Sequence, residues 1–150
     1  MTDIQAALGV SQMRRIGQII EERQHLAAEY SRSLECEWLE HPFQDNDYVH
    51  SFQSYPCLLI HGGLQLERAE QIRELRNGLM ENLQLAGIST RPATHAIHLL
   101  TFYKSKYQLV PERYPNAYLA DSCSISLPLF NGLTNIEQAH VISTLNGISL

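Results

Sequence analysis

The sequence predicts an α+β fold: a three-stranded, mainly antiparallel sheet with helices on one face and a long helix at the N-terminus. Apolar residues recur at the helical period of about 3.6 in three separate segments of the chain. Three short apolar or alternating segments end at glycine or proline, as strands commonly do. The resulting order is helix, strand, helix, strand, irregular stretch, strand, helix. This order favours a small sandwich with an antiparallel or mixed sheet over a doubly wound one.

Residues 1–34 read as helix almost throughout. Thr2 and Gln5 have the spacing of a capping box. Unbroken, the helix would span roughly 50 Å at about 1.5 Å per residue, which is too long for a compact domain of this size. We therefore predict a bend near Gly17, because glycine lowers helix propensity by about 1 kcal/mol relative to alanine. A helix of this length also predicts a partner surface elsewhere. Its apolar positions are Ile4, Leu8, Ile16, Ile19, Ile20, Leu26, Ala27, Tyr30 and Leu34.

Breakers and caps delimit the remaining elements. Gly87 is placed to end one helix, and Thr134 with Glu137 has the capping-box spacing that opens another. The serines that alternate with Ile125 and Leu127 are typical of a short strand. The predicted elements are an irregular stretch at 35–50, a strand at 51–60, a helix at 66–86, a short strand at 87–92, a strand at 123–129 and a helix from 134 to just before 147.

Size and charge restrict the function classes. At 150 residues the chain predicts one domain, in which residues 1–34 lead into a small α/β domain at 35–150. The formal charge of −5, with Lys104 and Lys106 as the only lysines, argues against nucleic acid and an acidic membrane surface as partners. No stretch resembles a signal segment or is long enough to span a membrane, so we expect a cytoplasmic protein. The charged runs at 14–15 and 21–23 are interpreted as solvated helix surface.

The three cysteines predict no disulfide framework and no zinc knuckle. Cys36, Cys57 and Cys123 are odd in number, lie far apart and lack C-x-x-C spacing. We interpret them as buried thiols in a reducing compartment.

The stretch RPATHAIHLLTFYKSKY, residues 91–107, carries the candidate site. His95 and His98 stand three apart, Arg91 lies just upstream, and Tyr103 follows. A zinc site would need further ligands, and no H-E-x-x-H motif, cysteine pair or acidic cluster supplies them. A nucleophilic mechanism has only Ser89 or Cys123 to draw on.

Two other interpretations of the histidines remain open. In the first, His98 and Leu99 face a core, whereas His95 is solvated or hydrogen-bonded to backbone. In the second, the stretch is an anion- or sugar-binding loop. Arg91 would then offer a planar fork to a carboxylate or phosphate, with the histidines and Tyr103 as further donors.

Six segments, in order along almost the whole chain, carry a resemblance to a known family. They are MTDIQAALGVSQM, ERQHLAAEYSRSL, SYPCLLI, GISTRPATHAIHLLTFY, YPNAYLADSCSISLPLF and LTNIEQAHVISTL. Together they resemble the C-terminal part of the DegT/DnrJ/EryC1/StrS aminotransferases, which are pyridoxal-phosphate enzymes that make amino sugars on nucleotide-linked substrates. MTDIQAALG and SLPL are the most specific pieces.

The resemblance implies a fold-type I architecture, with the active site at a dimer interface. In that architecture a large N-terminal domain holds the cofactor and a small C-terminal domain closes over it. Residues 1–150 match the small domain and the helix that leads into it. We therefore expect a nucleotide-sugar substrate in the intact enzyme. We also expect a homo-oligomer formed through the N-terminal helix, because loss of the large domain would leave apolar surface there.

The chain lacks two parts of the family pattern, both of which precede the segment that resembles MTDIQAALG in the family. The family has an aromatic-Asn-aromatic-Arg run before the segment that resembles MTDIQAALG, and a large upstream part with the Schiff-base lysine, the pyridine-pairing aspartate and the phosphate-binding residues. Lys104 and Lys106 match no such lysine. We therefore expect no cofactor on this chain alone and no transamination by it, since that reaction needs the cofactor on a lysine. A cloned domain, a truncated gene or an internal start would each explain the departure.

The resemblance also assigns substrate contacts. His98 and Tyr103 match the family's pattern of a histidine and, after four residues, a tyrosine, so they would contact the sugar nucleotide or its phosphates. His95 and Arg91 match a variant of that motif and would do likewise. The alternatives are a non-catalytic sugar-nucleotide-binding or regulatory module derived from the family, and a metal-dependent hydrolase that uses His95 and His98.

Overall fold

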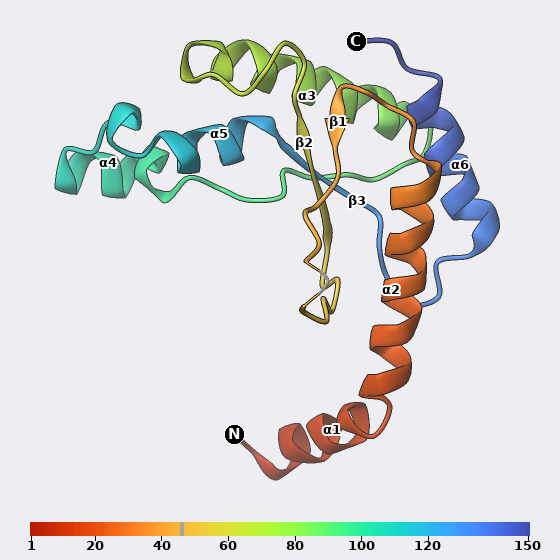
Figure 1. The fold of residues 1–150 in the computed structure, drawn as a ribbon. Helices are drawn as coiled ribbons and strands as arrows, with labels where there is room; N and C mark the ends of the chain where they lie inside the picture. The colour runs from red at the N-terminus through yellow and green to blue at the C-terminus, as the bar shows by residue number, and fades with distance from the viewer. Residues whose placement is uncertain (46) are drawn as a thin grey trace.

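The computed structural model describes residues 1–45 and 47–150 (Figure 1). Asn46 belongs to the stretch predicted as irregular and lies outside the described residues. The helices are α1 (Asp3–Met13), α2 (Ile16–Ser33), α3 (Ala69–Leu85), α4 (Thr101–Tyr107), α5 (Pro115–Cys123) and α6 (Asn135–Asn146). The strands are β1 (Leu39–Glu40), β2 (Tyr55–Leu59) and β3 (Ser124–Leu127), and the 3-10 turns are η1 (Leu66–Arg68), η2 (Ile97–Leu99) and η3 (Pro111–Arg113).

The sheet is three-stranded and antiparallel, in the order β1-β2-β3, as the sequence predicted. Two details of the predicted strands were wrong, and the stretch expected to be irregular before the last strand contains the helices α4 and α5. A two-residue strand, β1, lies within the stretch predicted as irregular, because so short a strand leaves no periodic pattern to read. The strand predicted at 87–92 contributes only an isolated bridge between Arg91 and Ser126, because Pro92 cannot donate the next hydrogen bond.

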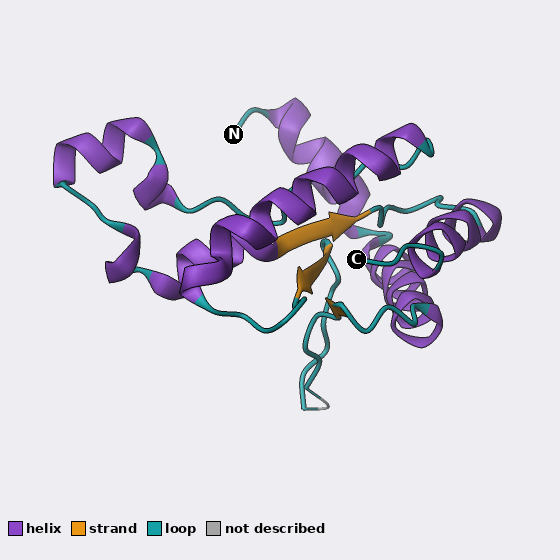
Figure 2. Ribbon diagram, turned by 90° about the horizontal axis from the view of Figure 1, so that it is seen from above, coloured by secondary structure: helices purple, strands orange, loops and turns teal. Residues whose placement is uncertain are grey.

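The core lies on one face of the sheet. The register places Tyr55 opposite Leu127, and Cys57 opposite Ile125, so these side chains share a face, and all four are buried. Helices α2, α3 and α6 supply the other side of the core. Figures 1 and 2 show α2 and α6 side by side. At the centre, the Tyr30 ring of α2 lies 5.1 Å from the Tyr55 ring, and its hydroxyl donates to the carbonyl of Pro128 at 2.8 Å.

The N-terminal segment forms two helices that meet at Arg14 and Arg15. Arg15 leaves the helical conformation, with φ −115° and ψ 10°, whereas Gly17 lies inside the first turn of α2. Figure 1 shows α1 turned sharply away from α2 and from the sheet. No residue of α1 is buried, and Ile4 and Leu8 are 76% and 63% exposed. The capping boxes predicted at Thr2 and at Thr134 are both present.

Arg23 is not the solvated side chain that the sequence suggested. Its Nη1 donates to the carbonyls of Phe52 (3.1 Å), Gln53 (3.0 Å) and Leu129 (3.4 Å), and its Nε donates to Oδ1 of Asn131 at 2.9 Å. The guanidinium therefore ties α2 to the chain before β2 and to the chain after β3. Helical spacing could not reveal these contacts, because every acceptor is distant in sequence.

Glu22 continues the same connection. Its carboxylate accepts from Nδ2 of Asn131 at 2.8 Å and from the backbone N–H of Gly132 at 2.7 Å. These two hydrogen bonds, that of Asn131 first, hold the pKa of Glu22 below its usual value. Glu22 and Arg23 of α2 thus both bind the loop after β3, at the side chain of Asn131.

We predict that Arg23→Ala destabilises the chain by about 2–3 kcal/mol, because four acceptors lose a charged donor. Arg32→Ala is the matched control on the same helix, since Arg32 is 75% exposed and its only ion pair in the described part of the chain is with Glu29. That variant should change stability by less than about 0.5 kcal/mol. Urea unfolding measures both free energies, and equal effects would contradict the role given to Arg23.

Candidate functional site

The carboxylate of Asp121, on α5, anchors the segment that carries the two candidate histidines. Its Oδ1 accepts from the backbone N–H of Ala96 at 3.0 Å, and its Oδ2 accepts from Nη2 of Arg73 at 3.1 Å. The same Nη2 donates to the Ser122 hydroxyl at 2.9 Å. The side chains of Arg73 and Asp121 are only 24% and 15% exposed, which limits screening of this ion pair by solvent. Asp121 therefore fixes the backbone between His95 and His98.

A second arginine, Arg76 of α3, binds the backbone at the C-terminal end of α5. Arg76 is 4% exposed, and its Nη1 donates to the carbonyls of Asp121 (3.0 Å) and Ser124 (2.9 Å). Burial lowers the pKa of Arg76, and the Asp121 carboxylate opposes that shift. Asp121 is therefore held twice: Arg76 binds its backbone carbonyl, and Arg73 and the Ala96 amide bind its carboxylate.

His98 is buried within an aromatic cluster. It is 5% exposed, its ring lies 5.1 Å from the Tyr114 ring at an interplanar angle of 27°, and the Tyr118 ring lies 6.4 Å away. Its Nε2 is shielded from solvent and has no hydrogen-bond partner among the described residues. An unpaired buried polar atom costs about 1–3 kcal/mol, so a hydrogen bond to a water or to a ligand group would stabilise this nitrogen.

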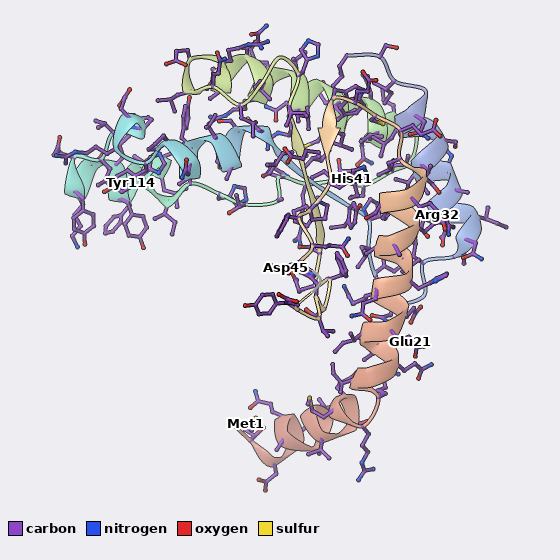
Figure 3. The ribbon with its side chains drawn as sticks, viewed as in Figure 1. Met1, Glu21, Arg32, His41, Asp45 and Tyr114 are labelled. Carbon is purple, nitrogen blue, oxygen red and sulfur yellow. The ribbon has the colours of Figure 1, made fainter. Side chains whose placement is uncertain are left out.

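His95 and Tyr103 lie in the same part of the fold as His98, the segment 92–114, which we call the His arm. The arm carries η2, α4 and η3 and projects to one side of the sheet (Figure 1). Figure 3 labels Tyr114 at its end. His95 is 74% exposed, with Nδ1 at 3.7 Å from Oδ1 of Asp121. Tyr103 is 40% exposed and its ring packs edge-on against Phe102 at 5.2 Å.

Arg91 lies apart from this group. It is exposed at the edge of the sheet, where its carbonyl accepts from the backbone N–H of Ser126 at 2.8 Å. It lines a cavity of about 200 Å³ to which neither histidine of the His arm contributes. His95, His98 and Tyr103 line none of five cavities of the described chain. Their roles in substrate binding stay predictions.

Sequence reasoning missed Asp121, Arg73 and Arg76. One signal was available: Arg76 follows Ile72 by four residues and precedes Leu79 by three, so it lies on the buried face of α3. A charged residue at such a position requires internal partners. Asp121 gave no comparable signal, because α5 is short and its acceptor role depends on a loop far away in sequence.

Both lysines lie on the surface, where a cofactor bound covalently to them would be exposed to water. Lys104 and Lys106 are exposed on α4, and Nζ of Lys106 lies over the rings of Phe102 (5.3 Å) and Tyr107 (5.4 Å). Neither side chain lies in the enclosed, desolvated setting that lowers the pKa of a Schiff-base lysine and makes it nucleophilic.

Within residues 1–45 and 47–150 there is no group of three or more His, Cys, Asp or Glu side chains that could hold a metal ion. Of the helices described, none is both long enough and apolar enough to cross a membrane.

The chain matches known proteins over nearly its whole length. The model of the DegT/DnrJ/EryC1/StrS aminotransferase family matches residues 1–146. GDP-perosamine synthase of Escherichia coli O157:H7 is 27% identical over 97% of this chain and 36% of its own length. The spore coat polysaccharide biosynthesis protein SpsC of Bacillus subtilis is 24% identical over 99% of this chain and 36% of its own length.

Solved structures agree with these sequence matches. The apo form of Spr1654 from Streptococcus pneumoniae, assigned as a sugar aminotransferase, superposes with a TM-score of 0.81 and 26% identity, over 97% of this chain and 34% of that one. The chain thus spans about a third of the length of the proteins that it matches. By its sequence and its fold, the chain belongs to the DegT/DnrJ/EryC1/StrS aminotransferase family.

Proposed function

We propose that this chain is the C-terminal part of a pyridoxal-phosphate aminotransferase that acts on nucleotide-linked keto sugars in the synthesis of amino sugars for cell-surface polysaccharides. The relatives named for perosamine and for spore coat polysaccharide support this substrate class. The observation that carries the proposal within the chain is the buried, unpartnered Nε2 of His98, on a backbone that Asp121 holds in place.

In this proposal the His arm forms one wall of the substrate site. His98 meets an oxygen of the diphosphate or of the sugar with the nitrogen that lacks a protein partner. Tyr103 offers an exposed phenol on the next helix, and His95 offers an exposed imidazole beside the Asp121 carboxylate. Arg91 contacts a separate part of the substrate or of the amino donor, since it lines a different cavity.

The proposal includes inactivity of the chain alone. Its two lysines lie exposed on α4, far from the enclosed position that a Schiff-base lysine needs to become nucleophilic. Pyridoxal phosphate would be held by residues outside these 150 in the intact enzyme. Amino transfer to a keto sugar by the purified chain supplied with the cofactor would overturn this part.

We also propose that α1 mediates association. Ile4 and Leu8, four residues apart on one side of α1, are 76% and 63% exposed, and contiguous exposed apolar surface commonly marks an interaction site. We expect a homo-oligomer formed through α1, and sedimentation of the chain as a monomer would argue against it. The cytoplasmic location stays a prediction.

A non-catalytic module that binds sugar nucleotides is the second candidate. The observation that favours it is that both lysines are exposed on α4, within a His arm whose backbone Asp121 holds in place. Both candidates require binding through His98 and differ in whether a covalently held cofactor ever acts beside it.

We predict that UDP-glucose or GDP-mannose shifts the His98 ring resonances saturably in an NMR titration. His98→Phe should abolish binding, because phenylalanine keeps the stack on Tyr114 but has no ring nitrogen. His25→Phe, at an exposed position of α2, is the matched control and should bind normally. No shift at His98, or equal binding by the His98 variant, would exclude the proposed contact.

We further predict that Asp121→Ala exposes the Ala96 amide to hydrogen exchange and weakens nucleotide-sugar binding by about tenfold, or about 1.4 kcal/mol. Asp121→Asn should restore much of both properties, because its amide oxygen can still accept from Ala96. Exchange is followed by NMR and affinity by calorimetry. Unchanged protection of Ala96 in the alanine variant would show that Asp121 does not position the arm.

A further inference from the structure

We propose that His50 is a proton-sensitive latch on the turn that precedes β2. The turn, residues 50–53, is closed while the imidazole is neutral and opens when the ring takes up a proton. The latch does not depend on the proposed function, because it needs neither a sugar nucleotide nor a cofactor.

The backbone of the turn is strained at Phe52. Its φ is 45°, in the left-handed region that a bulky aromatic residue rarely adopts. The side chain is nevertheless buried, at 4% exposed, and its ring lies 6.3 Å from the Tyr55 ring in the core. A residue in such a conformation persists only where the surrounding structure holds it. Contacts of residues 50–53 must therefore keep the turn closed.

Four hydrogen bonds within the described chain hold the turn. The backbone N–H of Phe52 donates to Nδ1 of His50 at 2.9 Å, and Nε2 of Gln24 donates to the His50 carbonyl at 2.9 Å. Nη1 of Arg23 donates to the carbonyls of Phe52 and Gln53, at 3.1 Å and 3.0 Å. A guanidinium, an amide and backbone groups keep their protonation states near neutral pH, whereas an imidazole does not. The bond to Nδ1 is thus the one among the four that a change of pH can break.

The bond to Nδ1 exists only in the neutral ring. Nδ1 accepts a hydrogen bond through its lone pair, so the ring proton of the neutral form must sit on Nε2. A second proton would occupy Nδ1 and leave two N–H groups facing each other across 2.9 Å. Two donors cannot share that contact, so proton uptake must open the turn. His50 is exposed, and solvent protons reach it directly.

Arg23 is the charge tied to the turn itself. It binds the carbonyl of the residue whose N–H meets Nδ1, so an imidazolium there would lie near a second positive charge. The Glu22 carboxylate is already bound to the loop after β3, and Oδ1 of Asp45 accepts from the backbone N–H of Asp47. The 4.3 Å contact between the two rings of the turn attracts a cation, but a ring face cannot replace the lost acceptor. The other titratable side chains in the adjoining stretches of α2, the loop and β2 are Glu21, His25, Tyr48 and Tyr55.

His41, at the other end of the same β1–β2 loop, keeps its hydrogen bond in either protonation state. The Ser31 hydroxyl donates to the Ala27 carbonyl at 3.0 Å, so it must accept from the Tyr55 hydroxyl at 2.8 Å. The oxygen of Tyr55 therefore accepts from Nδ1 of His41 at 2.9 Å, which requires an N–H on that nitrogen. A second proton on the ring goes to Nε2 and leaves this bond intact. His41 thus serves as an internal control for His50.

Opening of the turn changes the wall of the cavity beside β3. Gln53 and Ser54 line that cavity, and Gln53 follows directly on the strained residue. Proton uptake also frees Phe52 to leave the core, while the pairing of β2 with β3 is untouched. Acid should therefore reshape this cavity before it unfolds the sheet.

The test is hydrogen exchange and NMR of the 150-residue chain at about pH 8 and about pH 5, on either side of the ordinary histidine pKa of about 6.5. At the higher pH we expect the ring proton of His50 on Nε2 and a protected Phe52 amide. At the lower pH the protection factor of that amide should fall at least about tenfold. The Ile60 amide, which donates to the Trp38 carbonyl at 2.9 Å, should keep its protection. A Phe52 amide protected equally at both pH values overturns the proposal, as does a proton on Nδ1 at the higher pH.

Variants decide whether His50 is the group responsible. In His50→Asn, Oδ1 takes the place of Nδ1 and does not titrate, so the Phe52 amide should stay protected at both pH values. In His50→Phe the ring contact remains without an acceptor, and protection should be low at both. His41→Phe should keep the pH dependence of the unmodified chain. Loss of protection in His50→Asn at the lower pH, equal to that of the unmodified chain, would assign the effect to another group and overturn the latch.

Discussion

The carboxylate of Asp121 is the point on which the arrangement of the candidate site depends. It joins α3, through Arg73, to the backbone at Ala96, in a segment that has no strand partner of its own. Without it, the His arm would be joined to the rest of the fold mainly by its two ends and by the contact of the His98 ring with the Tyr118 ring of α5. Conformational entropy favours many orientations for a segment that has so few attachments. The ion pair therefore positions the arm relative to α3 and α5.

The fold uses two arginine guanidinium groups, one of them buried, in a consistent way. Arg23 and Arg76 both donate mainly to backbone carbonyls at places where the chain leaves regular structure. Carbonyls at such places would otherwise lose their water without gaining a partner, which is costly in the interior. One charged side chain satisfies two or three of them and fixes their relative positions. Arg23 does this at one end of β2 and β3, whereas Arg76 does it where α5 enters β3.

The sequence predicted the features that arise from local patterns. The antiparallel sheet, the two capping boxes and the family all follow from periodicity, spacing and short motifs near one another in the chain. The features it missed depend on contacts between distant residues. β1 exists only because Leu39 and Glu40 lie beside β2, and the helical pattern around Arg23 is the same whether its head group meets water or three carbonyls. The break at Arg14–Arg15 lies just before the glycine expected to cause it.

The separation of α1 from the rest of the chain has a thermodynamic consequence. Its eleven residues bury nothing, and isolated helices shorter than about 12–15 residues are only marginally stable in water. With a capping box as its main internal support, α1 is expected to be only marginally stable as a helix while Ile4 and Leu8 on one of its sides are uncovered. Whatever covers that side must therefore supply the ordering free energy of the helix as well as the contact. The measured affinity of any such association will understate the strength of the interface itself.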